Sequence, residues 1–465
     1  MTLDIELPSP AELGSLVEVR GWRRYPAYKD SGVPWLGEVP SHWQIRRMKH
    51  LVSQIGSGKT PRGGSQVYVT SGVMLLRSQN VHFAALRLDD VAFIDDEADC
   101  EMAGTRVLPE DVLLNITGAS LGRCCVVPTN FGRANVNQHV CILRSRPRVV
   151  APAYLHYLLR SHVLQAQIHS DENGSSREGL NFQQVGNLIA VLPPPDEQRS
   201  ILVKVMRETA KIDALVEKKR RLLGLIEEKR AALISHAVTK GLDPTAPMKD
   251  SGVEWLGQVP AHWELRPLMR LTPDDRQIMY GIVLPGPSVS DGVPIVKGGD
   301  VAPGRLRPER LQRTTTDIDA SHARSRLRGG DIVYAIRGSI GAVQPVPDEL
   351  TGANLTQDAA RISPRPDVDR QWLLHTLRSR PVFAQLDARA TGATIRGINI
   401  RDLKRAVIPV PCPQEQRSIS AHLDKETATL DKLAVMLLRH VKLLGEYRTA
   451  LISAAVTGKI DVREA

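Results

Sequence analysis

Several residue types and motifs that would mark a common functional class are scarce in this 465-residue sequence. It contains five cysteines and no C-x-x-C pair: Cys100, Cys124, Cys125, Cys141 and Cys412. An odd number of scattered cysteines argues against a disulfide framework and a thiolate zinc site, and is typical of a reducing compartment. Aromatic residues make up only 4% of the chain, so base stacking is not expected to be its main way of binding nucleic acid.

No hydrophobic run approaches the roughly 18–20 residues that a membrane-spanning helix requires. The first residues, MTLDIELPSP, lack the basic and apolar regions of a secretory signal. We therefore expect a cytoplasmic protein without a membrane partner. Its net charge of +10 favours a polyanionic partner, although many basic proteins bind no nucleic acid.

Motifs of common enzymes are absent as well. GSGKT at 56–60 is close to a phosphate-binding loop, but that motif requires glycine where this chain has Ser53. PPPD at 193–196 is not the N/D/S-P-P-aromatic motif with which amino-methyltransferases hold a flipped base. The 13 histidines show no metal-ligand spacing, and no glycine-rich loop for S-adenosylmethionine is evident. We expect no catalytic, cofactor or metal site on this chain.

The chain contains a long internal repeat. Residues 28–43, YKDSGVPWLGEVPSHW, return at 248–263 as MKDSGVEWLGQVPAHW, with twelve of sixteen positions identical. PPPDEQRSI from Pro193 returns as PCPQEQRSI from Pro411, and RAALISHAVTKGLD from Arg230 returns as RTALISAAVTGKID from Arg448. Because the boundaries match while the interiors differ, the sequence predicts two whole domains in tandem. A duplication retained only for stability is the alternative.

Each copy is expected to be a mixed α/β domain. Short β-branched runs at 73–81, 111–118 and 140–146 predict strands, and their counterparts lie at 293–301, 331–338 and 359–364. Apolar residues at helical spacing predict a helix at 152–168 and another at 370–386. A glycine-containing loop and a last strand, ended by prolines, follow in each copy.

A long helix is predicted after each proline cluster, because apolar residues recur there at a spacing of three or four. The expected pairing residues are Ile201, Val205, Ile212, Leu215, Leu222, Ile226, Leu233 and Ala237 in the first helix, and Ile419, Leu423, Leu430, Leu433, Leu437, Leu444 and Leu451 in the second. A helix of about 40 residues is about 60 Å long and cannot cover such a stripe alone. We expect the two helices to pair antiparallel, with packing of each on its own domain as the alternative.

The two repeated motifs, KDSGVxWLGxVPxHW and PxPxEQRSI, resemble those of type I specificity subunits, and the similarity covers nearly all of the chain after residue 27. The resemblance implies an α+β fold: a tandem duplication of two mixed α/β target recognition domains separated by two long antiparallel helices that form a coiled coil. The implied segments are an N-terminal extension at 1–27, domains at 28–195 and 247–411, and helices at 196–246 and 412–465.

The family also implies a function and partners. Each domain would read one half of a split double-stranded DNA sequence, and the helices would set the spacing between halves. Two modification subunits that carry S-adenosylmethionine and methylate adenine would bind this non-catalytic chain, and restriction (motor and nuclease) subunits can join them. Two alternatives remain: a specificity subunit of a methylation-only or other defence system, and a self-contained nuclease or methyltransferase with duplicated recognition modules.

Base-reading positions can be nominated only from side-chain chemistry. Arginine suits O6 and N7 of guanine, while asparagine and glutamine suit N6 and N7 of adenine. The nominated residues are Arg77, Ser78, Gln79 and Asn80 in the first copy, and Lys297 and Asp300 at the aligned place in the second. A solvated turn is the alternative for each of them.

Basic residues form a second group of DNA-binding candidates. Arg177 and Arg396 lie in aligned loops whose glycines allow the backbone to approach phosphate closely. A dense basic region of the second copy contains Arg305, Arg307, Arg310, Arg313, Arg324, Arg326 and Arg328. The alternation at 324, 326 and 328 predicts three guanidinium groups on one face of a strand, with a solvated charge run as the alternative.

Two tryptophans and a histidine also recur: Trp35, His42 and Trp43 in the first copy, and Trp255, His262 and Trp263 in the second. We expect structural wedges at the start of each domain rather than a cation or ligand site.

Overall fold

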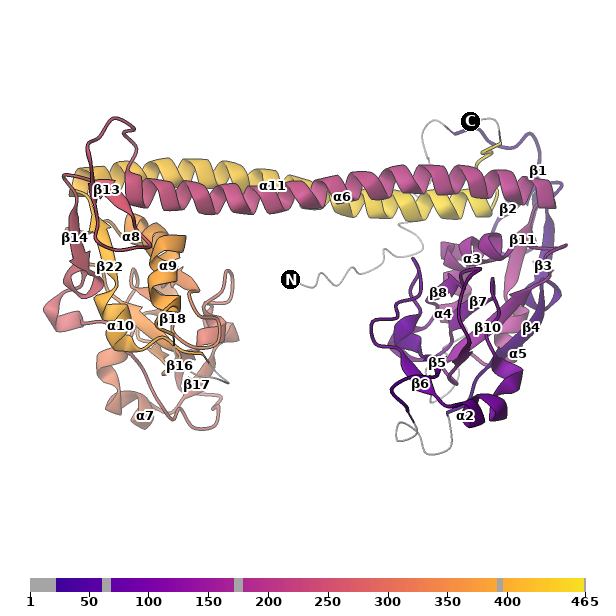
Figure 1. Ribbon diagram of the computed structural model, residues 1–465, viewed down its shortest axis with the longest axis horizontal. Coiled ribbons are helices and arrows are strands. Elements are labelled where there is room, and N and C mark those ends of the chain that lie inside the picture. Colours follow the sequence, from indigo (N-terminus) through magenta and orange to yellow (C-terminus); the bar gives the residue numbers. More distant parts are fainter. Residues whose placement is uncertain (1–21, 61–67, 171–178, 391–395, 464–465) are drawn as a thin grey trace. The chain divides into compact units, whose positions relative to one another are not determined.

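The computed structural model describes residues 22–60, 68–170, 179–390 and 396–463 (Figure 1). The chain divides into two compact units: unit 1 comprises Met1–Lys219 and Arg439–Ala465, and unit 2 comprises Arg220–Leu438. Each unit holds one of the two predicted domains and part of both long helices, and the repeated block at 230–243 or 448–461 lies in the unit of the other copy. This division cuts across the linear domain boundaries, which remain predictions. Among the described helices, none combines the length and apolar character needed to cross a bilayer.

In the described part of unit 1, an antiparallel four-stranded sheet has the order β4-β10-β7-β8, and a three-stranded sheet has the order β6-β5-β9. Two further pairs are β1-β2 and β3-β11. The strands are β1 (Tyr28–Asp30), β2 (Glu38–Pro40), β3 (Gln44–Arg47), β4 (Val52–Ser57), β5 (Val73–Leu76), β6 (Ala92–Ile94), β7 (Val112–Asn115), β8 (Cys124–Val126), β9 (Ala134–Val136), β10 (Val140–Ser145) and β11 (Ile189–Leu192). The short helices are α2 (Asp96–Glu101), α3 (Pro152–Arg160), α4 (His162–Ser170) and α5 (Phe182–Asn187).

Unit 2 repeats this topology, with sheets of order β15-β21-β18-β19 and β17-β16-β20 and the pairs β12-β13 and β14-β22. Its strands are β12 (Met248–Asp250), β13 (Gln258–Pro260), β14 (Glu264–Pro267), β15 (Met279–Tyr280), β16 (Val293–Val296), β17 (Gln312–Thr314), β18 (Ile332–Ala335), β19 (Val343–Pro345), β20 (Asn354–Leu355), β21 (Ala359–Ile362) and β22 (Val407–Val410). Its short helices are α7 (Thr316–Ser321), α8 (Arg370–Arg378), α9 (Arg380–Asp387) and α10 (Ile400–Arg405). The mixed α/β domains predicted from the sequence are therefore confirmed.

The four-stranded sheet is buried on both faces. Alternate residues of a strand point to opposite sides, so Val112 and Leu114 of β7 pack with Leu155 of α3. Leu113 packs on the other side, against Leu76 of the three-stranded sheet. This three-layer packing of helix, sheet and sheet explains why the runs of β7 and β18 are almost entirely apolar.

The helix predicted at 152–168 is two helices. The backbone of Ser161 is extended, and its buried hydroxyl donates to Leu158 O. The second copy breaks at Ser379, just before Pro381 in the first turn of α9. Apolar spacing continues across both breaks, so the pattern alone could not locate them.

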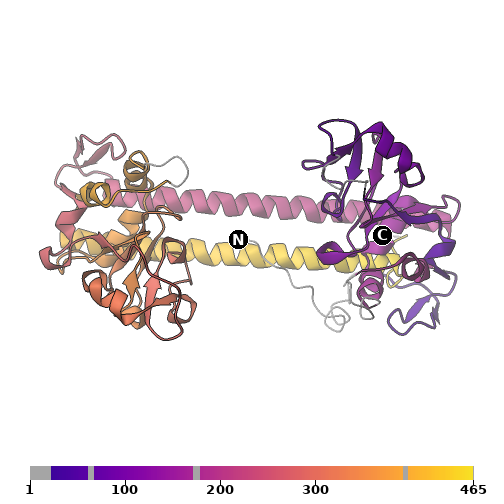
Figure 2. The same cartoon turned by 90° about the horizontal axis from the view of Figure 1, so that it is seen from below.

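The two long helices are α6 (Pro195–Lys240) and α11 (Pro413–Val456). In each unit a part of α6 lies beside a part of α11 (Figure 1, Figure 2). In unit 1, Asp213 pairs with Arg448, with 2.8 Å between Oδ1 and Nε, and Lys219 lies 3.4 Å from His440. Residue numbers rise along one helix as they fall along the other, so the antiparallel pairing is confirmed.

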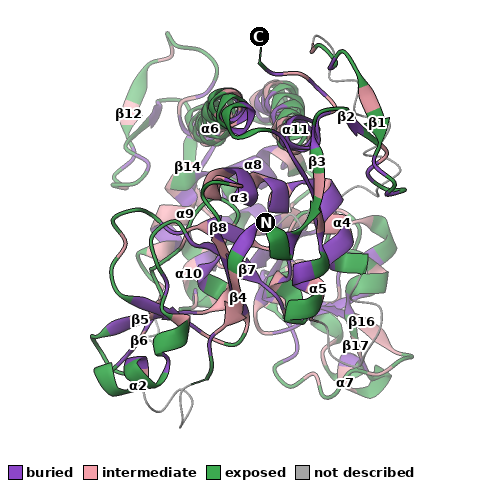
Figure 3. Cartoon of the chain, turned by 90° about the vertical axis from the view of Figure 1, so that its right-hand side faces the viewer, coloured by how far each residue is buried: buried purple, intermediate pink, exposed green. Residues whose placement is uncertain are grey.

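The buried and half-buried residues of these helices recur every seven residues, the pattern of a coiled coil. In unit 1 they include Ile201, Val205, Thr209, Ile212 and Val216 of α6 with Leu444, Arg448 and Leu451 of α11. In unit 2 they include Leu223, Ile226, Arg230, Leu233 and Ala237 of α6 with Ile419, Leu423, Thr427, Leu430, Ala434 and Leu437 of α11. Figure 3 shows that the outward faces of both helices are exposed.

The sequence prediction of the paired faces is wrong for three residues. Leu215, Leu222 and Leu433 are 43%, 48% and 44% exposed. In each case the next residue is also apolar and takes the inward position: Val216, Leu223 and Ala434. Because apolar residues spaced three or four apart form one face of a helix, the sequence allowed either of two adjacent apolar residues to take the inward position.

The repeated motifs contact each other. Trp43 is fully buried, and its indole Nε1 donates to Glu197 Oε1 at 3.0 Å, while His42 lies 2.8 Å from Glu197 Oε2. In unit 2, Trp263 and His262 make the same contacts with Glu415 of the second EQRSI motif. The prediction of a structural role is confirmed for these two tryptophans, which fasten each domain to the start of its long helix.

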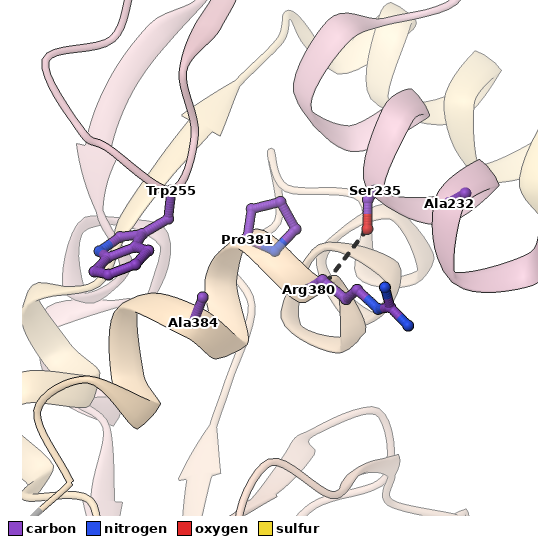
Figure 4. A pocket seen from close by; sticks show the side chains of 6 residues that line it. All are labelled: Ala232, Ser235, Trp255, Arg380, Pro381 and Ala384. Atoms are coloured by element: carbon purple, nitrogen blue, oxygen red, sulfur yellow. Dashed lines mark hydrogen bonds between the residues drawn. The ribbon is translucent and has the colours of Figure 1, made fainter. Parts of the chain in front are cut away.

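The other repeated tryptophans do not act as wedges. Trp35 and Trp255 are 55% and 43% exposed. Trp255 borders an open pocket of about 290 Å³ whose lining also includes Pro381 and Ala384 (Figure 4). The described residues that line this pocket include no carboxylate, so it does not have the chemistry of a cation site.

Candidate nucleic-acid interface

The nominated loops begin with 3-10 turns of identical construction, η3 (Ser78–Asn80) and η8 (Gly298–Asp300). The Arg77 N–H donates to Asn80 Oδ1 at 2.9 Å, and the Lys297 N–H donates to Asp300 Oδ2 at 2.9 Å. Asn80 is buried, and its amide nitrogen donates to Arg87 O. Asn80 and Asp300 therefore shape the turns, and this role occupies the groups nominated for base reading.

Between these caps, Gln79 and Gly299 are exposed, whereas Ser78 is half-buried and Gly298 is buried. Ser78 is anchored through its carbonyl, which accepts a hydrogen bond of 2.8 Å from Asn115 Nδ2 at the end of β7. Gln79 is exposed, and its amide donates to Asp90. Gly298 takes the place of Ser78 in unit 2, where a Cβ atom would lie 2.3 Å from Arg337 O. In unit 2 the backbone of Gly298 therefore packs directly against the backbone at the end of β18.

The glycine-containing loops meet the same strand ends. In unit 1 the Leu180 N–H donates to Ile116 O, and Thr117 forms a β-bridge with Gly179. In unit 2 the Ile398 N–H donates to Ile336 O at 2.8 Å, and Arg337 bridges Gly397. The two regions nominated separately from the sequence are thereby brought together within each unit.

Of the two nominated loop arginines, only Arg396 lies within the described residues. Arg177 lies outside the described residues. Arg396 directly precedes Gly397, and its Nη2 lies 3.0 Å from Asp387 O and 3.1 Å from Asp387 Oδ1. A phosphate contact by Arg396 would have to replace this ion pair, so its DNA-binding role stays a prediction.

Three further positions per unit lie at these strand ends and were missed in the sequence: Thr117, Gln138 and His139 in unit 1, and Arg337, Gln357 and Asp358 in unit 2. The Ile116 N–H donates to His139 O, and the Ile336 N–H donates to Asp358 O, so the two backbones match. The signal that could have identified them is the aligned repeat itself, in which Thr117 faces Arg337 and His139 faces Asp358, while Gln138 and Gln357 are the same residue.

The arginine-rich region of unit 2 does not form the predicted strand. Arg324 lies in the 3-10 turn η10 (Ala323–Ser325), and Arg326 and Arg328 follow in non-strand backbone. Arg326 is paired with buried Asp319, its Nε 2.9 Å from Oδ2. The expectation of three guanidinium groups on one strand face is therefore wrong, because Asp319 holds the middle one.

Arg326 belongs to a buried network that both units share. In unit 1, Asp99 accepts hydrogen bonds from Arg106 Nε at 2.9 Å and Asn135 Nδ2 at 3.1 Å. In unit 2, Asp319 accepts from Arg326 and from Asn354 Nδ2 at 2.7 Å. Burial acts to raise the pKa of Asp99, but the hydrogen bonds from Arg106, Asn135 and Arg133 outweigh it and lower that pKa.

The other nominated basic residues lie on the surface of unit 2. Arg305 donates to Gly299 O at 3.1 Å, next to the η8 turn, and Lys297 Nζ donates to Gln312. Arg307, Arg324 and Arg328 are exposed. These positions suit phosphate contacts, which remain a prediction.

The described residues contain two kinds of side chain that bear on catalysis, metal-ligating groups and thiols. They include no group of three His, Cys, Asp or Glu side chains that could hold a metal ion. Burial raises the pKa of Cys125 and of Cys141 to about 12, so these thiols stay protonated and poorly nucleophilic near neutral pH.

Comparisons with known proteins agree with this architecture, although no family model matches the sequence. The chain is 24% identical over 368 residues to the type I restriction enzyme EcoBI specificity subunit of Escherichia coli, covering 77% of this chain and 76% of that one. It is 22% identical over 436 residues to a protein described as the type I restriction enzyme MjaX specificity subunit, from Methanocaldococcus jannaschii, covering 92% of this chain and 96% of that one.

Two solved structures share the fold. A chain from a study of the assembly and conformational transition of the type I R-M system superposes with a TM-score of 0.60 at 18% identity, covering 90% of this chain and 98% of the other. The HsdS subunit from Thermoanaerobacter tengcongensis gives a TM-score of 0.53 at 18% identity, covering 93% and 100%. In its duplicated domains, its paired helices and its sequence, the chain is similar to the specificity subunits of type I restriction–modification enzymes.

Proposed function

We propose that this chain is the DNA sequence-recognition subunit of a type I restriction–modification complex, and that each unit reads one half of a split double-stranded target. The observation that carries the proposal is the site present in both units, where equal backbones present unequal side chains. Phosphate contacts position a protein on DNA, whereas side chains at base edges specify the sequence. Two sites of similar backbone and partly different side chains suit two unlike half-sites.

The chemistry of methylation is assigned to partners. As a specificity subunit the chain is non-catalytic, and we propose that two modification subunits bind it, carry S-adenosylmethionine and methylate adenine. Restriction subunits would join the same assembly. Native mass spectrometry of the purified complex should give two modification subunits for each copy of this chain.

The paired helices are proposed to set the spacing between half-sites. The helices α6 and α11 each contribute residues to both units, and their inward positions keep a seven-residue repeat. A rigid pair of this kind would fix the number of unread base pairs, as protein geometry fixes half-site spacing in dimeric repressors.

The test is long-read mapping of adenine methylation in cells that express this chain with the modification subunit encoded beside it. Cells that express the modification subunit alone are the control. We expect one split motif, with a fixed number of unread bases, only when this chain is present. Methylation by an active complex without any such motif would contradict the proposal.

Modularity is tested by exchanging residues 247–411 for those of a relative with another target. One half of the methylated motif should change and the other should stay. A change in both halves would show that the units do not read separately.

A further inference from the structure

Thr117 and Arg337 occupy the same place in the two units. Each follows the last residues of the equivalent strand, β7 or β18, and each forms a β-bridge to a glycine of the loop that precedes α5 or α10. Just before them, the Ile116 N–H donates to His139 O, and the Ile336 N–H donates to Asp358 O. The two backbones are held alike except that the Arg337 N–H also donates to Asp358 O at 3.1 Å, so the main difference between the two positions is the side chain.

The guanidinium of Arg337 is oriented by the uncharged side chain of Gln357. Its Nη1 donates to Gln357 Oε1 at 3.0 Å. No ion pair joins Arg337 to a carboxylate in the part of the chain that the structure describes, whereas Arg326 and Arg396 are paired with Asp319 and Asp387. The positive charge of Arg337 is therefore not neutralised, and its guanidinium is nevertheless oriented.

The remaining donors of Arg337 suit a guanine. The side chain is exposed, and within the described residues neither Nε nor Nη2 has a protein acceptor. Two adjacent N–H groups of a planar guanidinium match O6 and N7 of guanine, the commonest specific contact in the major groove. An amide at Nη1 leaves this pair of donors free, whereas a carboxylate would compete with the base.

Building on the proposed function, we propose that Arg337 reads a guanine in the half-site of unit 2 and that Gln357 is the positioning residue that orients it. Position 117/337 is then a specificity-determining position in both units. It adds to the η3 and η8 turns nominated from the sequence, which lie against the same strand ends.

Unit 1 has different chemistry at this position. Thr117 Oγ1 lies 2.7 Å from His139 Nδ1, and Gln138 Nε2 lies 3.0 Å from His139 Nε2. Thr60 donates to Gln138 Oε1 at 2.7 Å. Because this cluster contains no guanidinium, the half-site of unit 1 is not expected to require guanine at the equivalent base pair.

The experiment compares the complete complex carrying Arg337→Ala, Arg337→Lys or Gln357→Ala with wild type. Methylation motifs are mapped in cells, and binding is measured to duplexes that vary each base of the target. Arg337→Ala should lower discrimination at one guanine of one half-site by roughly 5- to 150-fold, and the other half-site should keep its requirements. Arg337→Lys should retain part of this discrimination.

Gln357→Ala should relax the same base pair, and the double variant should relax it no further than Arg337→Ala alone. Arg266→Ala is the matched control, because Arg266 is a half-buried surface arginine of the same unit that pairs with Glu264 on a different sheet, β14-β22. It removes the same charge and should leave every base requirement unchanged.

Two results would overturn the inference: Arg337→Ala with an unchanged motif, or relaxation that falls equally on both half-sites. The failure of the proposed function is a separate result, since the wild-type complex would then direct no split motif. Equal thermal unfolding of wild type and Gln357→Ala would show that a lost base requirement is not a loss of fold.

Discussion

Replacing Asp99 by alanine is expected to loosen the three-stranded sheet of unit 1. Its carboxylate is fully buried and accepts hydrogen bonds from Arg106, Arg133 and Asn135, the last of which lies in β9. Removing one partner of a buried ion pair costs about 3–5 kcal/mol. We expect the lower end, about 3 kcal/mol, because the side chains of Arg106 and Arg133 are 43% and 64% exposed and can be solvated once freed.

Hydrogen exchange followed by mass spectrometry measures this locally. A loss of about 3 kcal/mol corresponds to roughly 150-fold faster exchange of the protected amides in β5 and β9. Peptides of β16 and β20 in unit 2 should be unaffected and serve as the internal control. Asp319→Ala should produce the mirror result, with faster exchange in unit 2 only.

The same carboxylate predicts a pH dependence. The pKa of Asp99 is lowered in the folded chain, so its contribution to stability is present above the pKa of the unfolded state, about 3.9, and is lost as pH falls through the folded value. The difference between wild type and Asp99→Ala should therefore be constant from pH 7 to 5 and shrink below about pH 4. A change of less than about threefold in β9 exchange at pH 7 would refute this account of the network.

Three further outcomes are expected. In urea titrations, Leu430→Ala should lower the free energy of unfolding by about 2–3 kcal/mol, and Leu433→Ala should lower it by less than about 1 kcal/mol, because these leucines are 9% and 44% exposed. Equal losses would contradict the helix register. Inserting one heptad into α6 between Glu208 and Glu228 should change the number of unread bases in the methylated motif or prevent assembly, whereas an active complex with unchanged spacing would refute the spacing role. Arg396→Ala should reduce the salt dependence of DNA binding by about one unit of slope, and an unchanged slope would leave Arg396 with its Asp387 pair alone.

The fold was largely predictable because it is encoded twice. The matching HW and EQRSI motifs predicted two like domains, and the structure shows why those motifs are alike: Trp43 and Trp263 each donate to the glutamate of an EQRSI motif. The helix register was less predictable. Leu215 and Val216 are adjacent apolar residues, and only packing against the second helix decides which of them turns inward.

The site was predictable in part. The loop regions could be nominated because glycine, asparagine and arginine follow predicted strands. The partner of a charged group could not be predicted. Asp319 and Arg326 are seven residues apart, and only the backbone path through α7 and the turn η10 brings them together. Thr117 and Arg337 were missed because the aligned repeat shows that the side chain changes there but not where it lies; the bridges to Gly179 and Gly397 place both residues beside the nominated turns.

The composition of unit 1 has a consequence for synthesis on the ribosome. Unit 2 is one continuous stretch, Arg220–Leu438, whereas the core of unit 1 includes Leu451, Val456 and Val462 from beyond it. Tyr154 donates to Val456 O at 3.1 Å, and the Asp461 N–H donates to Arg23 O at 2.7 Å. The domain that is translated first therefore completes its core only after unit 2 has been made, when Leu451, Val456 and Val462 return to it. A chain released early at residue 438 would keep every residue of unit 2 and lack the closing part of unit 1.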